Sequence, residues 1–323
     1  MFPSLVADIG GTNARFAIVT GPRGQQFEFE HVALLRGEDF PNFEDAMAAY
    51  LADLGDCGLH SACIAIAGPI RGDDVKMTNL PWSFSQKALA AKFNLRSFVA
   101  INDFTAQALA SSRIAPEGLT RLLDGDTNPV GNKAILGPGT GLGVAGLAWA
   151  NTFWLPIASE GGHSTMPAAN LYEAEILGAL MRQHGYVSAE TCVSGPGLEH
   201  LYQAVADTKG YTAELLEAPE ISLRALNDSD ALCREALELF CAFLGTVSSN
   251  FALTYGATGG VYLTGGILPR FIDFVRASRF EERFRNKGVM SHYMQSIPVD
   301  IITYEQTAFL GAAAWLHQHC VDA

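Results

Sequence analysis

The pattern of hydrophobic and polar positions predicts a chain in which strands and helices alternate. Three apolar runs near the start are separated by the turn residues 10–13 and 21–24, which is typical of antiparallel strands. Apolar positions then recur with the helical period, and two continuous apolar runs of strand length flank a second helical segment. The expected strands are residues 4–9, 14–20, 27–35, 62–67 and 97–101, and the expected helices are residues 43–54 and 85–93.

A similar order recurs in the rest of the chain. Strand-like runs around glycine-rich turns come first, helical segments follow, and a late strand precedes an alanine-rich closing helix. Two copies of one plan, without a proline- or serine-rich linker, predict an α/β chain of two domains that share a cleft, each with a mixed sheet and flanking helices. The expected strands are residues 133–136, 143–149, 152–158, 260–264 and 299–302, and the expected helices are residues 171–184, 197–206, 223–227, 230–255, 271–284 and 307–318.

Composition narrows the class of protein. Of the 323 residues 49% are apolar and 17% are charged, which favours a large buried core and excludes intrinsic disorder. The formal charge of −13 disfavours nucleic acid or a membrane surface as the main partner. Residues 134–159 and 239–269 carry no charge, but Gly, Pro, Ser, Thr and Asn interrupt both stretches, so we expect them in a soluble core rather than in a membrane.

The cysteines and the first residues indicate the compartment. No basic segment precedes the first apolar run, so we expect no signal peptide. The cysteines form no C-x-x-C pair and have no metal-like spacing with histidine, so we expect reduced thiols in a cytoplasmic protein. These cysteines are Cys57, Cys63, Cys192, Cys233, Cys241 and Cys320.

Glycine-rich turns are the first candidates for chemistry. Gly10-Gly11-Thr12 follows a strand that contains Asp8, and consecutive amides of such a turn can wrap an anion while the carboxylate holds a hydrated Mg²⁺. An ordinary hairpin turn is the alternative. The cluster at residues 259–266 surrounds a buried strand with two glycine pairs, and either a ligand or tight packing at a sheet edge explains it. Gly195-Pro196-Gly197 is expected only to start a helix.

The turn at residues 137–143 resembles a dinucleotide fingerprint only superficially. After Gly139 and Gly141, the position of the third glycine is occupied by Val144, and the following residues have the pattern of a strand rather than a helix. A nicotinamide oxidoreductase is therefore disfavoured. A P-loop is excluded because the chain contains no Gly-Lys dipeptide.

Polar residues at the ends of strands are the second group of candidates. Asp103 follows a buried strand and precedes a helix, where it is either the cap of that helix or a general base at the edge of the sheet. Position alone favours the cap. Glu160 and His163 flank two glycines in a region that is otherwise poor in charge, so they either converge on a polyol or form a solvated turn. Glu190 is a weaker candidate than these two, and an acidic residue in the first turn of a helix is the alternative.

Taken together, these motifs resemble the bacterial glucokinase family of the hexokinase–actin–Hsp70 superfamily, over nearly the whole chain. The matching segments are residues 8–15, 101–106, 137–143, 160–163, 188–190 and 265–267, in one order and at compatible spacings. The resemblance implies two RNase H-like domains of the hexokinase/actin type with a ligand cleft between them. Residues 1–106 and 307–323 would form the smaller domain, and residues 107–306 the larger one.

The resemblance also implies a function and roles for residues. The activity would be phosphorylation of D-glucose to glucose 6-phosphate, the first step of glycolysis, with ATP and Mg²⁺ as co-substrate. Asp103 would be the general base for the 6-hydroxyl, and Asp8 would also hold the metal through water. The sugar ligands would be Asn102, Asp103, Glu160, His163 and Glu190. The nucleotide ligands would be Asp8, Ile9, Gly10, Gly11, Thr12, Asn13, Gly139, Thr140, Gly141, Gly265 and Gly266.

Related kinases and repressors of the ROK group carry a cysteine-rich zinc motif after the sugar-segment histidine. Residues 164–171 contain no cysteine, so the resemblance is to the zinc-free branch and no zinc is expected. No helix-turn-helix precedes the first strand, which disfavours a repressor. The family suggests a homodimer. A kinase of this fold for another hexose or amino sugar, and a sugar-sensing protein without turnover, are the alternatives.

Overall fold

The computed structural model describes residues 2–23, 26–55, 57–68, 70–77 and 80–319; Gly24 and Cys320, named above, lie outside them. The chain divides into two compact units. The first contains Met1–Gly118, Ala150–Ala158 and Tyr304–Ala323, and the second contains Leu119–Trp149 and Ser159–Thr303. The division into folding domains near residues 106 and 306 stays a prediction.

A five-stranded sheet forms the centre of the first unit, in the order β3-β2-β1-β4-β7. Strands β1, β2 and β3 are antiparallel, and β4 and β7 run parallel to β1. The three antiparallel strands followed by alternating units confirm the mixed sheet predicted from the sequence. The bounds are β1 Ser4–Ile9, β2 Asn13–Arg23, β3 Gln26–Arg36, β4 Ser61–Ile66 and β7 Ser97–Asn102.

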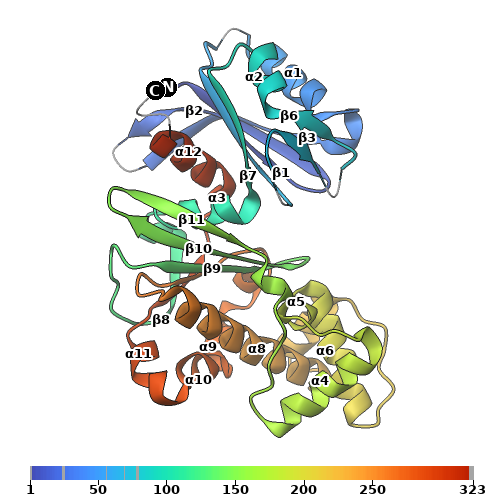
Figure 1. The fold of residues 1–323 in the computed structure, drawn as a ribbon. Helices are drawn as coiled ribbons and strands as arrows, with labels where there is room; N and C mark the ends of the chain where they lie inside the picture. The colour runs from blue at the N-terminus through green and yellow to red at the C-terminus, as the bar shows by residue number, and fades with distance from the viewer. Residues whose placement is uncertain (1, 24–25, 56, 69, 78–79, 320–323) are drawn as a thin grey trace. The chain divides into compact units, whose positions relative to one another are not determined.

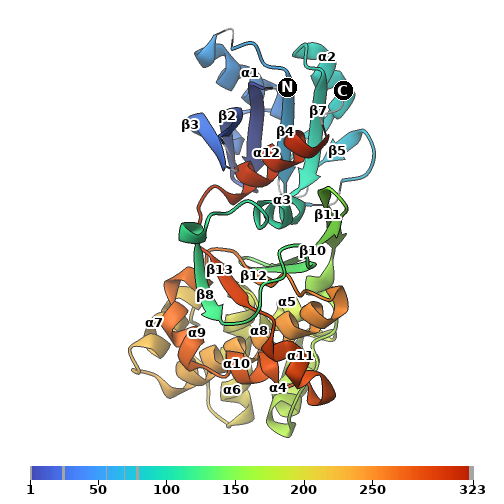
Figure 2. The same cartoon turned by 90° about the vertical axis from the view of Figure 1, so that its left-hand side faces the viewer.

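Helices cover both faces of this sheet (Figures 1 and 2). Because side chains along a strand alternate between faces, Leu5 and Ala7 pack towards α1 (Phe43–Leu54) and α2 (Gln86–Lys92), while Val6 packs towards the other side. On that other side lie α3 (Asp103–Ala110) and α12 (Thr307–His319). A short hairpin of β5 (Asp74–Lys76) and β6 (Ser83–Ser85) forms a separate two-stranded sheet.

The second unit repeats the plan of the first. The strands of its sheet follow the order β10-β9-β12-β13-β8; β10 is antiparallel to β9, and β12 and β13 run parallel to β9. All residues of β11 except Ser159 belong to the first unit. The recurrence predicted from the sequence is thus confirmed, with β8 added as an antiparallel strand beside β13. The bounds are β8 Leu119–Leu123, β9 Lys133–Pro138, β10 Leu142–Ala150, β11 Phe153–Ser159, β12 Val261–Leu263 and β13 Val299–Ile302.

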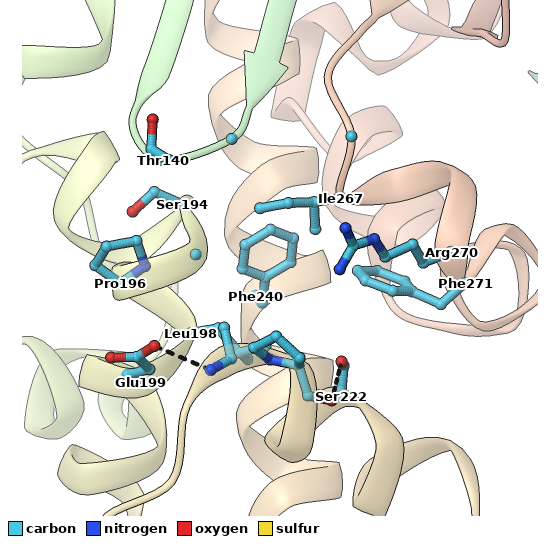
Figure 3. Close-up of a pocket in the computed structure, with 15 residues that line it drawn as sticks. Thr140, Ser194, Pro196, Leu198, Glu199, Ser222, Phe240, Ile267, Arg270 and Phe271 are labelled. Atoms are coloured by element: carbon cyan, nitrogen blue, oxygen red, sulfur yellow. Dashed lines mark hydrogen bonds between the residues drawn. The ribbon is translucent and has the colours of Figure 1, made fainter. Parts of the chain in front are cut away.

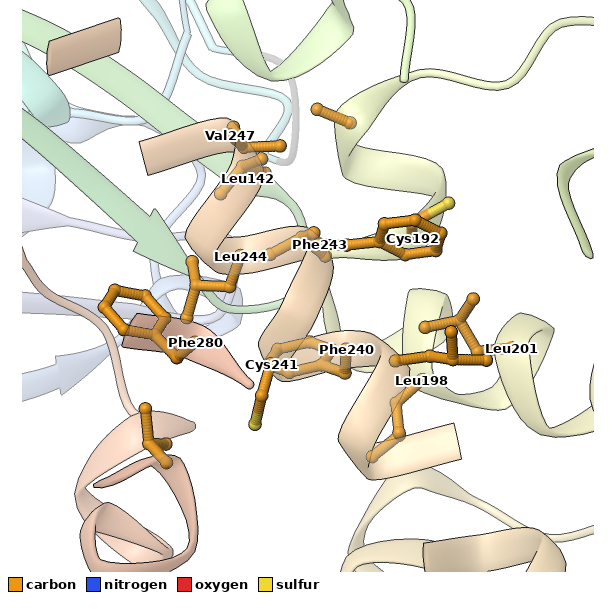
Figure 4. Packing of buried hydrophobic residues seen from close by; sticks show 14 of the residues in the cluster. Leu142, Cys192, Leu198, Leu201, Phe240, Cys241, Phe243, Leu244, Val247 and Phe280 are labelled. Carbon is orange, nitrogen blue, oxygen red and sulfur yellow. The ribbon is translucent and has the colours of Figure 1, made fainter. Parts of the chain in front are cut away.

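The core of the second unit is built around the long helix α8, Ala231–Tyr255 (Figure 4). Phe240 and Phe243 are completely buried in it, and burial of each such side chain contributes about 1.5–3 kcal/mol. By length and composition alone α8 could cross a membrane, but 78% of its most apolar 18-residue window is buried inside the structure, as in the core helix of a soluble protein. The surrounding helices are α4 Leu171–His184, α5 Ala189–Cys192, α6 Gly195–Thr208, α7 Ala218–Leu226, α9 Ile272–Ala277, α10 Phe280–Arg285 and α11 Ser291–Gln295.

Two predicted helices differ from the structure. The helix expected over residues 271–284 is divided into α9 and α10, because Ser278 adopts an extended backbone between them and its hydroxyl accepts the N–H of Phe280. The helix expected to begin at residue 223 begins at Ala218, where Pro219 occupies the first turn, a position that suits proline. Strands β5, β6 and β8 were not predicted, since each is only three to five residues long.

Candidate functional site

The first glycine turn joins β1 to β2 in the first unit. The Gly10 N–H donates to the Asn13 carbonyl oxygen over 2.9 Å, and the Thr12 carbonyl oxygen accepts the N–H of Gly37 over 2.8 Å. Within the described residues, the amides of Gly11 and Thr12 have no hydrogen-bond partner, and both residues are exposed. Consecutive open amides of this kind are a feature with which turns can bind an anion.

Asp8 and Ile9 lead into this turn with different environments. Ile9 is buried in the core, so only its backbone is available to a ligand. Asp8 is partly buried and stands opposite Arg15 in the register of β1 and β2. Burial raises the pKa of the Asp8 carboxyl group, and the Arg15 guanidinium acts in the opposite direction. The Asp8 side chain lies at the same end of β1 as the glycine turn.

Asn102 and Asp103 lie at the same edge of this sheet. In the parallel registers Ile9 pairs with Ile66, and Ile66 pairs with Asn102, so the carboxyl ends of the three strands are level. The cap of α3 is Asn102 rather than Asp103: its Oδ1 accepts the N–H of Phe104 over 2.9 Å and the N–H of Thr105 over 3.2 Å. The reading of Asp103 as the cap is therefore wrong.

The side chains of these two residues are held differently. The Asn102 amide nitrogen also donates to the Gly68 carbonyl oxygen over 3.2 Å, which ties the end of β7 to the segment after β4. Asp103 is the first residue of α3, and its Oδ1 accepts the N–H of Phe104 over 2.9 Å. A carboxylate at this position lies at the edge where open α/β sheets bind ligands.

The second glycine turn joins β9 to β10 in the second unit and repeats the design of the first. The Gly139 N–H donates to the Gly141 carbonyl oxygen over 2.8 Å. The Leu142 N–H donates to Glu190 Oε2 over 2.7 Å. The amides of Thr140 and Gly141 have no partner in the part of the chain that the structure describes, so this turn also leaves two consecutive N–H groups open.

Glu160 and His163 lie at the two ends of one turn of 3₁₀-helix, Gly161–His163. The two glycines of this turn serve close packing rather than flexibility. A Cβ atom at Gly161 would lie 2.4 Å from the Phe251 ring, and one at Gly162 would lie 1.9 Å from the Leu142 carbonyl oxygen. The sugar segment predicted from the sequence is therefore packed directly on the start of β10, beside the second glycine turn.

Backbone pairing of residues 164–165 with residues 188–189 brings Glu190 close to His163. The Ala189 N–H donates to the Ser164 carbonyl oxygen over 2.8 Å, and Thr165 and Ser188 form a β-bridge. As a result Glu190 Oε1 lies 3.8 Å from His163 Nδ1. Three of the predicted sugar ligands thus lie on neighbouring segments of the second unit, whereas Asn102 and Asp103 belong to the first unit.

A cavity of about 320 Å³ opens beside the second glycine turn (Figure 3). Gly265 directly precedes the lining residue Gly266: its φ is +95°, and a Cβ atom there would lie 2.5 Å from the Pro138 carbonyl oxygen, so both conformation and space require glycine. Apolar side chains form most of the wall, with one acidic and one basic side chain among them. The lining residues are Gly139, Thr140, Ser194, Gly195, Pro196, Leu198, Glu199, Ala218, Pro219, Ser222, Phe240, Gly266, Ile267, Arg270 and Phe271.

Comparison with known proteins decides the family. The model of the glucokinase family matches residues 5–319. A glucokinase of Saccharophagus degradans is 55% identical over 98% of this chain and 99% of its own length, and one of Neisseria meningitidis is 44% identical over 98% and 96%. The chain belongs to the glucokinase family.

Solved structures of glucokinases have the same fold. The glucokinase of an Antarctic psychrotroph is 39% identical, with a TM-score of 0.93 over 98% of this chain and 100% of that one. A ROK-family glucokinase of Streptomyces griseus, solved with glucose and AMPPNP, is 16% identical with a TM-score of 0.61 over 98% and 99%, which shows the fold alone. The predicted α/β fold with mixed sheets flanked by helices is therefore confirmed for this member of the glucokinase family.

Gly195 has a second role that the sequence did not indicate. Gly195 starts α6 as expected, but its N–H also donates to the Gly139 carbonyl oxygen over 2.8 Å, and Gly195 lines the cavity. Glu199, Phe240 and Arg270 were missed as lining residues altogether. Glu199 and Phe240 lie within regular helices and Arg270 within a short 3₁₀ turn, so no local pattern distinguishes them.

Proposed function

We propose that the chain transfers the γ-phosphoryl group of MgATP to the 6-hydroxyl of D-glucose. The observation that carries this proposal is the family membership, with named glucokinases 55% and 44% identical over 98% of the chain. The site residues support it. Phosphoryl transfer needs little covalent help from a protein, but it needs an aligned acceptor, a base, and donors for the phosphates.

The two glycine turns would bind the phosphates. Each offers two consecutive N–H groups that no other group of the described chain uses, at Gly11 and Thr12 and at Thr140 and Gly141. Asp8 would hold the hydrated Mg²⁺ that accompanies the triphosphate, because Mg²⁺ prefers carboxylate and water oxygens. The cavity beside Gly265 and Gly266 would take the nucleoside, because its wall is largely apolar and leads directly from the second turn.

The acceptor sugar would be held by side chains that accept and donate hydrogen bonds. Glu160, His163 and Glu190 lie on adjoining segments of the second unit, and Asn102 and Asp103 would complete the set. Each unpaired polar group of a buried sugar would cost about 1–3 kcal/mol, which explains the concentration of carboxylates. Asp103 would accept the proton of the 6-hydroxyl as the new bond to phosphorus forms. A cytoplasmic homodimer in the first step of glycolysis completes the proposal.

The substitution Asp103→Asn tests the assignment of the base. It removes the proton acceptor but keeps the shape of the side chain, so kcat should fall about 10²–10⁴-fold while glucose still binds. Asp53→Asn, on the exposed side of α1, is the matched control and should keep full activity. Near-normal turnover of Asp103→Asn in a coupled assay of glucose 6-phosphate formation would refute the role.

Direct detection of the phosphorylated sugar separates the alternatives. A panel of glucose, mannose, fructose and glucosamine identifies the preferred acceptor, and ATP against polyphosphate identifies the donor. A sugar sensor without turnover would bind glucose yet form no phosphorylated product with any donor.

A further inference from the structure

The Glu190 carboxylate lies between the sugar segment and the second glycine turn. Its Oε2 accepts the Leu142 N–H over 2.7 Å, and its Oε1 lies 3.8 Å from His163 Nδ1. The two oxygens of one side chain therefore face two different parts of the site. About a third of the side chain is exposed, so Oε1 can still be reached by a bound sugar.

The backbone that carries Glu190 is firmly held. Helix α5 is a single turn, and Ser188 and Thr191 close it with a reciprocal pair of hydrogen bonds at its start. The Ser194 hydroxyl donates to the carbonyl oxygen of Glu190 over 2.8 Å. A carboxylate on so well-fixed a turn has a defined position.

The glycine turn is shaped around this carboxylate. A Cβ atom at Gly141 would lie 2.5 Å from Glu190 Oε2, so the turn and the side chain fit closely only because residue 141 is glycine. On the other side, the Gly139 carbonyl oxygen accepts the N–H of Gly195 over 2.8 Å. Because Glu190 accepts the Leu142 N–H, the next amides towards the N-terminus, those of Thr140 and Gly141, are the ones left open to phosphate.

We infer that Glu190 is a positioning residue that couples the sugar segment to the phosphate turn. Through Oε2 it fixes the turn in the geometry that binds nucleotide, and a sugar held at Oε1 and His163 alters nucleotide affinity through the same carboxylate. The inference rests on the proposed function for the identity of the two ligands. The proposed function assigns Glu190 to sugar binding, and the inference adds a role in nucleotide binding that a purely sugar-binding side chain would not have.

The test is the affinity for MgADP in the absence of glucose, measured by isothermal titration calorimetry. Glu190→Ala should weaken MgADP binding about tenfold, since a hydrogen bond to a charged group is lost. Glu190→Asp should do the same, because its shorter side chain does not reach Leu142. Glu190→Gln keeps an oxygen that accepts the Leu142 N–H, so its MgADP affinity should stay within about threefold of wild type. His163→Ala should weaken glucose binding while MgADP affinity is unchanged.

The coupling is measured by repeating each titration with saturating glucose. In the wild type glucose should change MgADP affinity, and by thermodynamic reciprocity MgADP should change glucose affinity by the same factor. In Glu190→Ala and Glu190→Asp that factor should approach one. If both variants are folded by circular dichroism and bind MgADP as the wild type does, the inference is overturned. A wild type that binds MgADP but does not phosphorylate glucose would instead contradict the proposed function.

Discussion

At Gly162 a single added methyl group, in Gly162→Ala, should strongly disturb the predicted sugar segment. A methyl group there would lie 1.9 Å from the Leu142 carbonyl oxygen, whereas real contacts of this kind are essentially never shorter than 3.0 Å. Leu142 is at the start of β10, and its own N–H is bonded to Glu190. In Gly162→Ala the turn that carries His163 must therefore move away from Leu142 by about 1 Å.

The size of the effect follows from this displacement. Inserting a methyl group into a close-packed contact costs about 1–3 kcal/mol of the free energy of unfolding. A displacement of about 1 Å at a substrate-positioning segment can lower activity about 10²-fold. We therefore expect Gly162→Ala to lose about 1–3 kcal/mol of stability and about 10²-fold in kcat/KM for glucose.

Steady-state kinetics of glucose 6-phosphate formation and urea unfolding measure the two effects separately. Gly178→Ala is the matched control, because residue 178 lies within α4 and an added methyl group would approach only Arg182, at 3.9 Å. Alanine favours a helix over glycine, so this control should gain about 0.5–1 kcal/mol and keep its activity. Wild-type kinetics and stability in Gly162→Ala would show that the packing of the sugar segment on Leu142 does not constrain the site.

Two further predictions concern buried charges of the second unit. Burial lowers the pKa of Lys133 from 10.5 to about 8, so between these pH values the unfolded chain binds a proton that the folded chain does not. The free energy of unfolding of the wild type, relative to that of Lys133→Met, should therefore rise by about 1–3 kcal/mol from pH 8 to pH 10.5. A difference that is independent of pH would contradict this prediction. Glu173 is completely buried and accepts a hydrogen bond from Arg283 over 3.0 Å. Glu173→Ala should therefore lower the free energy of unfolding in urea by about 3–5 kcal/mol. The double variant with Arg283→Ala should lose less than the sum of the two single losses, and strict additivity would refute the pairing.

The amino-acid sequence was sufficient to predict those features that depend on neighbouring residues. Apolar period and turn residues predicted both sheets and most helices, because strand and helix periods are properties of neighbouring residues. The same local reading placed Asp103 directly after a strand and found both glycine turns. It failed at the cap of α3, since the choice between Asn102 and Asp103 depends on the backbone angles at which the strand ends: Asn102 is extended, as a capping residue must be.

Only the tertiary structure decided how the motifs work together. Glu190 and Leu142 are 48 residues apart, and the wall of the cavity comes from segments between residues 139 and 271. The two glycines between Glu160 and His163 permit close contact with Leu142 and Phe251, which lie far from them in the sequence. The amino-acid sequence thus determined which elements form and which chemical groups they carry. The contacts that hold those groups in place depend on residues far apart in the chain, and they exist only once the sheets and helices have packed.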